Sequence, residues 1–218
     1  MIIREERQGD EARIRGVNVA AFEKSLEADL VDALRRQATP LVSLVAEDDA
    51  NVIGHILFSP VTLASDPRLI LMGLAPMAVV PSRQRQGVGS TLVREGLERC
   101  RQLNVAAVVV LGHSEYYPRF GFLPAVRLSL RSEYDVPEEV FMVRELRDGV
   151  FRGLSGTIRY HPVFGTSSPA FGHRLSPVDV LIRFSRPGSS ADAAQIRRLQ
   201  RSSQRAKVRT KGKGQRST

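Results

Sequence analysis

The sequence contains one cysteine, no tryptophan and no apolar run long enough to cross a membrane. The single Cys100 excludes an internal disulfide and a cysteine-rich metal site. A membrane-spanning helix needs about 18 or more consecutive apolar residues, and no segment offers them. The first residues, MIIREERQGDEAR, are charged and have no apolar core, so we expect no signal peptide. These absences favour a protein of the reducing cytoplasm, without a membrane partner and without a bound metal.

The excess basic charge lies in the last 36 residues. The formal net charge is +9, but the segment 183–218 carries eleven Lys and Arg and one acid, Asp192. The residues before it are almost neutral, with 21 basic and 22 acidic side chains. The segment has few large apolar residues, so it cannot bury enough surface to offset its ordering entropy. We therefore expect one folded domain over 1–171 and a disordered basic tail over 183–218.

The first 171 residues alternate between strand and helix patterns. Apolar residues at helical spacing predict helices over 9–21, 26–37 and 87–103, with Cys100 on the buried stripe of the third. Short apolar or alternating runs predict strands over 1–7, 41–47, 52–63, 69–80, 105–111, 125–130, 140–146 and 155–160. The run VAAVVVL at 105–111 is apolar throughout, which is typical of a central parallel strand. With strand 69–80 and helix 87–103 it predicts a right-handed βαβ unit.

The turn between strand 69–80 and helix 87–103 carries glycines and arginines in the order Gln84-Arg-Gln-Gly87-Val-Gly-Ser90. Glycine lets backbone N–H groups approach a phosphate, and a helix N-terminus adds unpaired donors and partial positive charge. Arg83 and Arg85 add formal charge. Leu92 stands where a dinucleotide fingerprint has its third glycine, and the Lys of a P-loop is absent. The segment is therefore expected to bind the diphosphate of a cofactor other than a dinucleotide or a nucleoside triphosphate. The alternative is an ordinary glycine-rich turn without a ligand.

The pattern Gln-x-x-Gly-x-Gly, after a strand and opening a helix, resembles the acyl-CoA loop of the GNAT-type N-acetyltransferases. A second block, Tyr117-Pro-Arg-Phe-Gly121-Phe122, resembles the Tyr-x-x-x-Gly-Phe element of that family. The order and spacing of the two blocks match as well. Segments 54–61 and 141–146 are similar to a third and a late strand of the YhbS-like branch. The resemblance covers about residues 1–165 and does not reach the tail.

The resemblance implies the GNAT (acyl-CoA N-acyltransferase) fold. This α/β fold has a mixed, twisted sheet that is flanked by helices and splayed between its fourth and fifth strands. Gly73 or Pro76 is expected to mark the irregularity that opens the slot, because proline cannot donate to a strand ladder. The segment 124–171 is expected to complete the sheet.

The resemblance also implies an acyltransferase that moves an acetyl or short acyl group from acetyl-CoA to a primary amine by direct attack. Residues expected to bind the pantetheine arm and the diphosphate are Met77, Ala78, Val79, Gln84, Arg85, Gln86, Gly87, Val88, Gly89 and Ser90. Tyr117 matches the family's general acid, and a phenol with an ordinary pKa of about 10 can protonate a thiolate of pKa about 8.5. The acceptor would be a small-molecule or peptide amine, and such domains often form homodimers.

The sequence does not identify the general base. Glu27, in the helix over 26–37, borders the acceptor cleft in the family and is the first candidate. His55, His113 and Glu115 are the others. Deprotonation through water would need no dedicated residue.

Two other functions remain open on the sequence. A non-catalytic acyl-CoA sensor or adaptor would use the same loop, and the basic tail would tether it to nucleic acid. A hydrolase would use Ser114, because Gly112-His-Ser-Glu-Tyr116 is similar to a nucleophile elbow without its last glycine. His161 or His173 and Asp135 would complete its triad.

Overall fold

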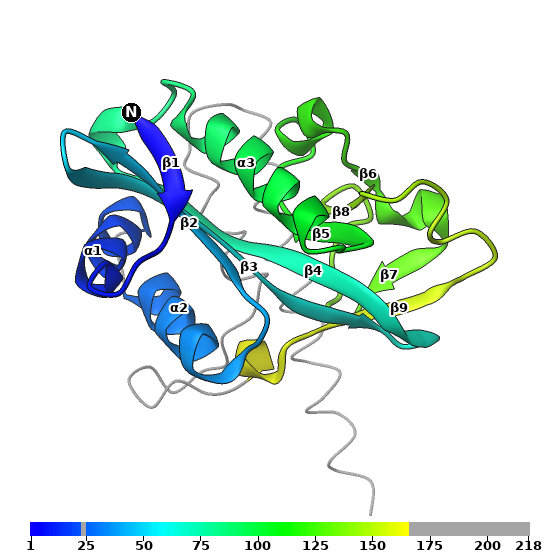
Figure 1. Cartoon of the computed structure of the whole chain (residues 1–218). Coiled ribbons are helices and arrows are strands. Elements are labelled where there is room, and N and C mark those ends of the chain that lie inside the picture. Colours follow the sequence, from blue (N-terminus) through cyan, green and yellow to red (C-terminus); the bar gives the residue numbers. More distant parts are fainter. Residues whose placement is uncertain (23–24, 166–218) are drawn as a thin grey trace, which may run out of the picture.

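The computed structural model describes residues 1–22 and 25–165, which form a twisted nine-stranded sheet with helices on both faces (Figure 1). The helices and strands are β1 (Ile2–Glu5), α1 (Glu11–Phe22), α2 (Leu26–Gln37), β2 (Val42–Asp48), β3 (Asn51–Leu63), β4 (Asp66–Val79), α3 (Val88–Gln102), β5 (Ala107–Leu111), β6 (Leu123–Pro124), β7 (Leu130–Ser132), β8 (Phe141–Glu145) and β9 (Gly156–Tyr160). Four short 3₁₀ helices, η1 (Pro81–Arg83), η2 (Tyr117–Phe120), η3 (Ala125–Leu128) and η4 (Pro162–Gly165), lie in the connections.

The sheet is mixed, as the resemblance implies. The strands follow the order β1-β2-β3-β4-β5-β8-β6, while β9 pairs with the far end of β3 and with β7. The β4–β5 and β7–β9 pairs are parallel and the others are antiparallel. The unit β4-α3-β5 is therefore the predicted βαβ crossover, and β5 is a central strand with every residue buried.

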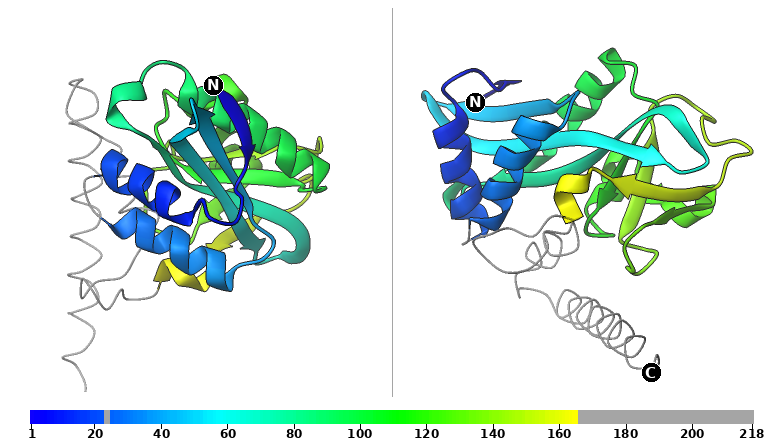
Figure 2. Two further views of the ribbon diagram at one scale, coloured as in Figure 1. Left: turned by 60° about the vertical axis from the view of Figure 1, so that its left-hand side comes forward. Right: turned by 90° about the horizontal axis from the view of Figure 1, so that it is seen from below.

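Alternate residues of the strands build a separate core on each face of the sheet. The core under α1 and α2 contains Val45, Leu57 and Val109, whereas the core under α3 contains Ile56 and Val110. The views in Figures 1 and 2 agree that α1 and α2 lie side by side on one face and α3 on the other. This arrangement follows from the period of two along a strand.

The apolar stripes predicted for the helices are confirmed. Leu26, Leu30, Val31 and Leu34 on α2 are buried, and so are Val88, Leu92, Val93, Leu97 and Cys100 on α3. Burial raises the pKa of the Cys100 thiol to about 12, so it remains a protonated core side chain.

The strand predicted over 125–130 is wrong. Its first four residues form the 3₁₀ helix η3, and only Leu130 begins the strand β7. In a 3₁₀ helix, residues three apart share a face, and Ala125 and Leu128 both pack against the core while Val126 is exposed. The apolar residues of this segment therefore reach the core at a spacing of three rather than at the spacing of two that a strand would have.

An irregularity in β4 separates it from β5. Ile56 pairs with Met77 and Phe58 pairs with Leu74, so Ala75 and Pro76 stand opposite one residue of β3. This is a β-bulge at Pro76, one of the two positions expected to carry it. The β4–β5 pairing ends at Leu74, although β4 continues to Val79. We call the region beyond Leu74, where β4 no longer pairs with β5, the split.

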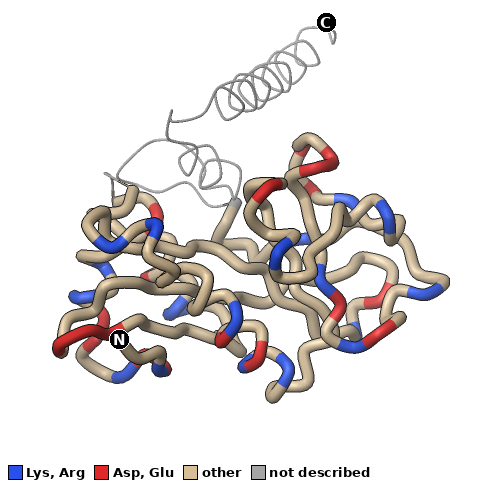
Figure 3. The backbone as a smooth tube through the Cα atoms, turned by 90° about the horizontal axis from the view of Figure 1, so that it is seen from above, with Lys and Arg blue, Asp and Glu red and all other residues tan. Residues whose placement is uncertain are grey.

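Several predictions fall outside the described residues. These are the basic tail over 183–218, its boundary with the domain that we expect to end at 171, and the sheet-completing segment beyond 165. Figure 3 shows acidic and basic residues interspersed along the described chain. No helix within 1–22 and 25–165 is long and apolar enough to cross a membrane.

The contact between α3 and the sheet depends on Gly96. A Cβ atom at this position would lie 2.3 Å from Cε2 of Phe58, which is fully buried on β3. We predict that Gly96→Ala lowers the free energy of unfolding by about 1–3 kcal/mol through overpacking, although alanine favours a helix. The control is Gly16→Ala on α1, where a Cβ meets nothing within 4 Å and which should stabilise by about 0.5–1 kcal/mol. Urea unfolding of both variants measures the difference, and equal effects would contradict the packing account.

Candidate functional site

The connection from β4 to α3 has the backbone shape of an anion-binding loop. Arg85 and Gly87 have positive φ angles of 61° and 87°, and Gly87 is the N-cap of α3. Successive N–H groups in such a left-handed turn can point to one side and form a concave nest. Among the described residues, no hydrogen bond uses the backbone N–H groups of residues 85–90. The loop therefore presents consecutive free donors at the positive end of the α3 dipole.

The side chains of the loop serve it in different ways. The Gln84 side chain donates to the backbone oxygen of Val79 over 3.0 Å, and Gln86 donates to that of Ser82 over 3.0 Å. Both contacts brace the loop and leave its N–H groups free. Arg83 pairs with Asp48, so its charge is balanced within the protein. Arg85 has no carboxylate partner in the part of the chain that the structure describes.

The bulged end of β4 turns backbone groups into the split. The Val80 N–H donates to the Ile53 oxygen, so by antiparallel alternation Ala78 and Val80 bond to β3. Met77 and Val79 then direct their backbone groups away from β3, toward the side where β5 no longer pairs. Both residues belong to the set that the resemblance assigns to binding the pantetheine arm and the diphosphate.

Tyr117 lies beside the split, on the face that carries α3. Its ring packs on Gly112, just after β5, where a Cβ atom would come 2.1 Å from Cε2 of the ring. The side chain is 5% exposed, and its hydroxyl makes no hydrogen bond to a described residue. Burial, with a smaller contribution from Tyr116, raises the pKa of Tyr117 above its ordinary value. The phenol is therefore protonated over the whole physiological range and can act as a donor.

Two candidate bases lie on the opposite face. Glu27 is in the first turn of α2 and is fully buried. His55 is also fully buried, on β3, with Nδ1 3.2 Å from Nδ2 of Asn18 and Nε2 3.0 Å from Oγ of Ser43. Burial, reinforced by the charge of Arg35, lowers the pKa of His55 to about 3. Both ring nitrogens are engaged, so His55 is a neutral structural group rather than a base at neutral pH.

The remaining candidates lie in the segment after β5. His113 is half-buried, and its backbone oxygen accepts from the N–H groups of Tyr116 and Tyr117. Glu115 is exposed. Ser114 makes no hydrogen bond to a histidine among the described residues, and Nδ1 of His161 accepts from the Val163 N–H over 3.3 Å. The described chain thus brings no hydrolase triad together; His173 lies outside it.

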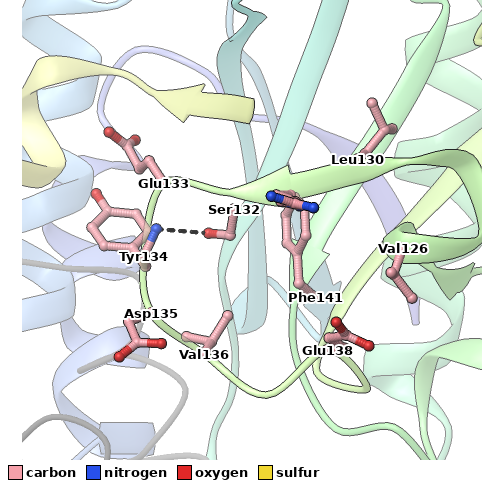
Figure 4. A pocket seen from close by; sticks show the side chains of 10 residues that line it. Val126, Leu130, Ser132, Glu133, Tyr134, Asp135, Val136, Glu138 and Phe141 are labelled. Atoms are coloured by element: carbon pink, nitrogen blue, oxygen red, sulfur yellow. Dashed lines mark hydrogen bonds between the residues drawn. The ribbon is translucent and has the colours of Figure 1, made fainter. Parts of the chain in front are cut away.

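A cavity of about 340 Å³ opens between β7 and the segment that leads to β8 (Figure 4). Phe141, which pairs with the last residue of β5, is one of its walls. The exposed carboxylates of Glu133, Asp135 and Glu138 stand around it, with Arg131 as the one basic lining residue. Tyr134 also lines it. The cavity is therefore predominantly acidic and lies near the end of β5.

The sequence does not predict a role for Tyr116 in the site, although this residue directly precedes the tyrosine that the motif identifies. Its hydroxyl lies 3.4 Å from Oγ of Ser90, across 26 residues of sequence. A Cβ atom on Gly89 would lie 3.2 Å from the same hydroxyl. Tyr116 therefore closes one side of the loop. No local pattern signals this contact, because it depends on how η2 packs against α3.

Comparison with known proteins agrees with this geometry. Residues 12–122 match the model of the Acetyltransferase (GNAT) family. The uncharacterized N-acetyltransferase YhbS of Escherichia coli K12 is 38% identical over 165 residues, which cover 75% of this chain and 98% of YhbS. The crystal structure of Escherichia coli YhbS in complex with CoA has a TM-score of 0.71 and 36% identity, over 79% of this chain and 95% of that chain. A GNAT family acetyltransferase of Brucella melitensis in complex with acetyl-CoA has a TM-score of 0.61 and 37% identity, over 73% and 95%.

The buried His55 makes stability depend on pH in a defined window. Its pKa is about 3 in the folded protein and about 6.5 when unfolded, so below pH 6.5 the unfolded chain binds the extra proton. We predict that the free energy of unfolding is flat above pH 7 and falls by up to about 1.4 kcal/mol per pH unit below 6.5. Asp10, whose pKa is held at about 2 by its hydrogen bond to Arg4, adds to this loss only below about pH 4.

The measurement is urea unfolding of the wild type and His55→Gln at half-unit steps between pH 7.5 and 4.5. The variant should lose most of the slope, whatever its stability at pH 7. A wild-type slope that persists in His55→Gln would assign the proton to another group.

Proposed function

The chain belongs to the GNAT acetyltransferase family and is an N-acetyltransferase, and from this premise we propose that it transfers an acetyl group from acetyl-CoA to a primary amine. The observation that carries the proposal is the row of free N–H groups at 85–90 beside the split. The CoA complex of YhbS and the acetyl-CoA complex of the Brucella melitensis protein support the choice of donor. The tail has no assigned role in this proposal.

The diphosphate of acetyl-CoA would bind at residues 84–90. Consecutive backbone donors at a helix N-terminus stabilise a phosphate by hydrogen bonds and by the helix dipole. From there the pantetheine arm would enter the split along Met77, Ala78 and Val79, where the backbone groups of Met77 and the backbone N–H of Val79 face away from β3 and can hydrogen-bond its amides. The thioester would then lie beyond Leu74, between β4 and β5.

In the reaction, the amine attacks the thioester carbonyl and forms a tetrahedral intermediate. A backbone N–H freed at the bulge of β4 stabilises the oxyanion, because a fixed donor in a dry site needs little reorganisation. When the C–S bond breaks, the Tyr117 hydroxyl donates a proton to the departing sulfur. The attached nitrogen then loses a proton to solvent and Tyr117 regains one, so that the products are the acetylated amine and free CoA.

The amine would approach from the face that carries α1 and α2. Tyr117 occupies the α3 face, whereas Glu27 belongs to the helix pair on the other side. With Tyr117 and Glu27 on opposite faces of the sheet, the acid would serve the departing sulfur and the base would serve the attacking amine. We assign Glu27 as the base that removes the proton of the attacking ammonium group, directly or through water.

The acidic cavity of Figure 4 favours a cationic acceptor. Glu133, Asp135 and Glu138 attract an ammonium group, and Phe141 places the cavity beside the end of β5. A panel with spermidine, lysine methyl ester, a basic peptide and uncharged aryl amines tests this preference by release of free CoA. Equal or better use of the uncharged amines would contradict it.

The loop is tested by binding. We predict that Gly89→Val weakens acetyl-CoA binding by at least about tenfold, or about 1.4 kcal/mol, because the branched side chain narrows the space between α3, Met77 and Tyr116. Gly16→Val makes the same helical substitution on α1, where nothing lies within 4 Å, and serves as the control. Calorimetric titration with acetyl-CoA gives both affinities. Unchanged affinity in Gly89→Val would remove the loop from the binding site.

The acid is tested by kinetics. We predict that Tyr117→Phe lowers kcat by about 10²–10⁴-fold and leaves the affinity for acetyl-CoA nearly unchanged, because only the proton donor is lost. Tyr160→Phe is the control, since Tyr160 is also buried and its pKa is also raised by burial. The rates come from CoA release with the best amine of the panel. A Tyr117→Phe enzyme with wild-type kcat would exclude the tyrosine from the mechanism.

A further inference from the structure

Two arginines stack on an aromatic pair next to the loop. Tyr116 and Phe120 pack edge to face, with ring centroids 5.3 Å apart. Cζ of Arg119 lies 4.6 Å from the centroid of Tyr116, and Cζ of Arg94 lies 5.6 Å from that of Phe120. We call these four residues the arginine platform. A guanidinium group held on a ring keeps its N–H edge available for an anion.

The platform is continuous with the diphosphate loop. Ser90, in the first turn of α3, lies 3.4 Å from the Tyr116 hydroxyl. Arg94 is one turn further along the helix, and side chains four residues apart share a face. The loop at 85–90, the Tyr116 hydroxyl and the two guanidinium groups therefore lie in sequence along one side of α3.

No carboxylate in the part of the chain that the structure describes balances the charge of the platform. Neither Arg94 nor Arg119 has a carboxylate within 4.0 Å among the described residues. By contrast, Arg99 and Arg101 on the same helix pair with Glu5 and Glu98. Two uncompensated guanidinium groups beside a row of free N–H donors favour a ligand with more than one phosphate.

We propose that the arginine platform binds the 3′-phosphoadenosine end of acetyl-CoA and so restricts the acyl donor to the complete coenzyme. The inference rests on the proposed function, because the diphosphate must occupy the loop for the nucleotide to reach the platform. Arg119 and Arg94 supply charge-assisted hydrogen bonds to the 3′-phosphate, which is the group that a thioester of pantetheine lacks. The aromatic rings hold the two guanidinium groups in place.

A purely structural role of the same contacts predicts something different. An exposed cation–π pair adds a little to stability and does not distinguish one ligand from another. The readout must therefore compare ligands that differ only in the 3′-phosphate.

The experiment is calorimetric titration of the full chain with acetyl-CoA and with acetyl-3′-dephospho-CoA. The wild type should bind acetyl-CoA about tenfold or more tightly than the dephospho form, as expected for a charge-assisted contact. Arg119→Gln and Arg94→Gln should each lose affinity for acetyl-CoA, keep their affinity for the dephospho form and so lose the preference. The control is Arg101→Gln, whose side chain pairs with Glu98 and which should retain the full preference.

The outcomes separate the proposals. A wild type that binds both coenzymes equally overturns the arginine platform and leaves the acetyltransferase intact. Variants that weaken both ligands by the same factor also overturn it, because they indicate a structural effect. A wild type that binds neither coenzyme contradicts the proposed function itself, and this inference with it.

Discussion

The structure depends on the point where β4 and β5 stop pairing. The bulge that places Ala75 and Pro76 opposite one residue of β3 keeps β4 in register with β3 while it leaves β5 after Leu74. A parallel pair in the middle of a covered sheet would otherwise bury all its backbone groups in the ladder. The bulge interrupts that ladder, so the backbone groups of β4 beyond Leu74 do not pair with β5. Every element of the proposed site is arranged around the split.

The two faces of the sheet give the split two chemical environments. On the α3 face, the loop at 85–90 and the arginine platform are rich in donors and positive charge, which suits a phosphorylated coenzyme. On the other face, the side chain of Glu27 on α2 is buried, and His55 is fixed between Asn18 and Ser43 as a neutral group. In the function proposed above, this asymmetry places the coenzyme on one face and the amine on the other.

Much of this architecture is predictable from local sequence. Three features depend on residues that are close together in the chain: the apolar stripe on α2, the apolar run of β5 and the loop with Gly87. Hydrophobic periodicity and the residue preferences of turns therefore identify them. The bulge was expected at Gly73 or Pro76 because the resemblance implies an irregular fourth strand and proline cannot donate to a strand ladder. The strand expected over 125–130 failed because Ala125 and Leu128 satisfy the core equally well at a spacing of three.

The contacts that long-range packing creates were not predictable. The Tyr116 hydroxyl lies near Ser90 only because η2 packs against α3. Likewise, the ion pair between Arg83 and Asp48 links the loop to β2. The burial that lowers the pKa of His55 needs α1, β2 and β3 together. Neither the resemblance nor the composition carries this information, since each contact joins segments that are separate in sequence.

The central claim is that backbone amides at 85–90 hold the diphosphate of the coenzyme. Hydrogen exchange measured by NMR at these amides, with and without saturating acetyl-CoA, tests it most directly. The account predicts that exchange slows at several amides of this segment, because their free N–H groups gain acceptors, and that S-acetylpantetheine does not slow it. Exchange that stays unchanged at 85–90 while acetyl-CoA is bound would contradict the account.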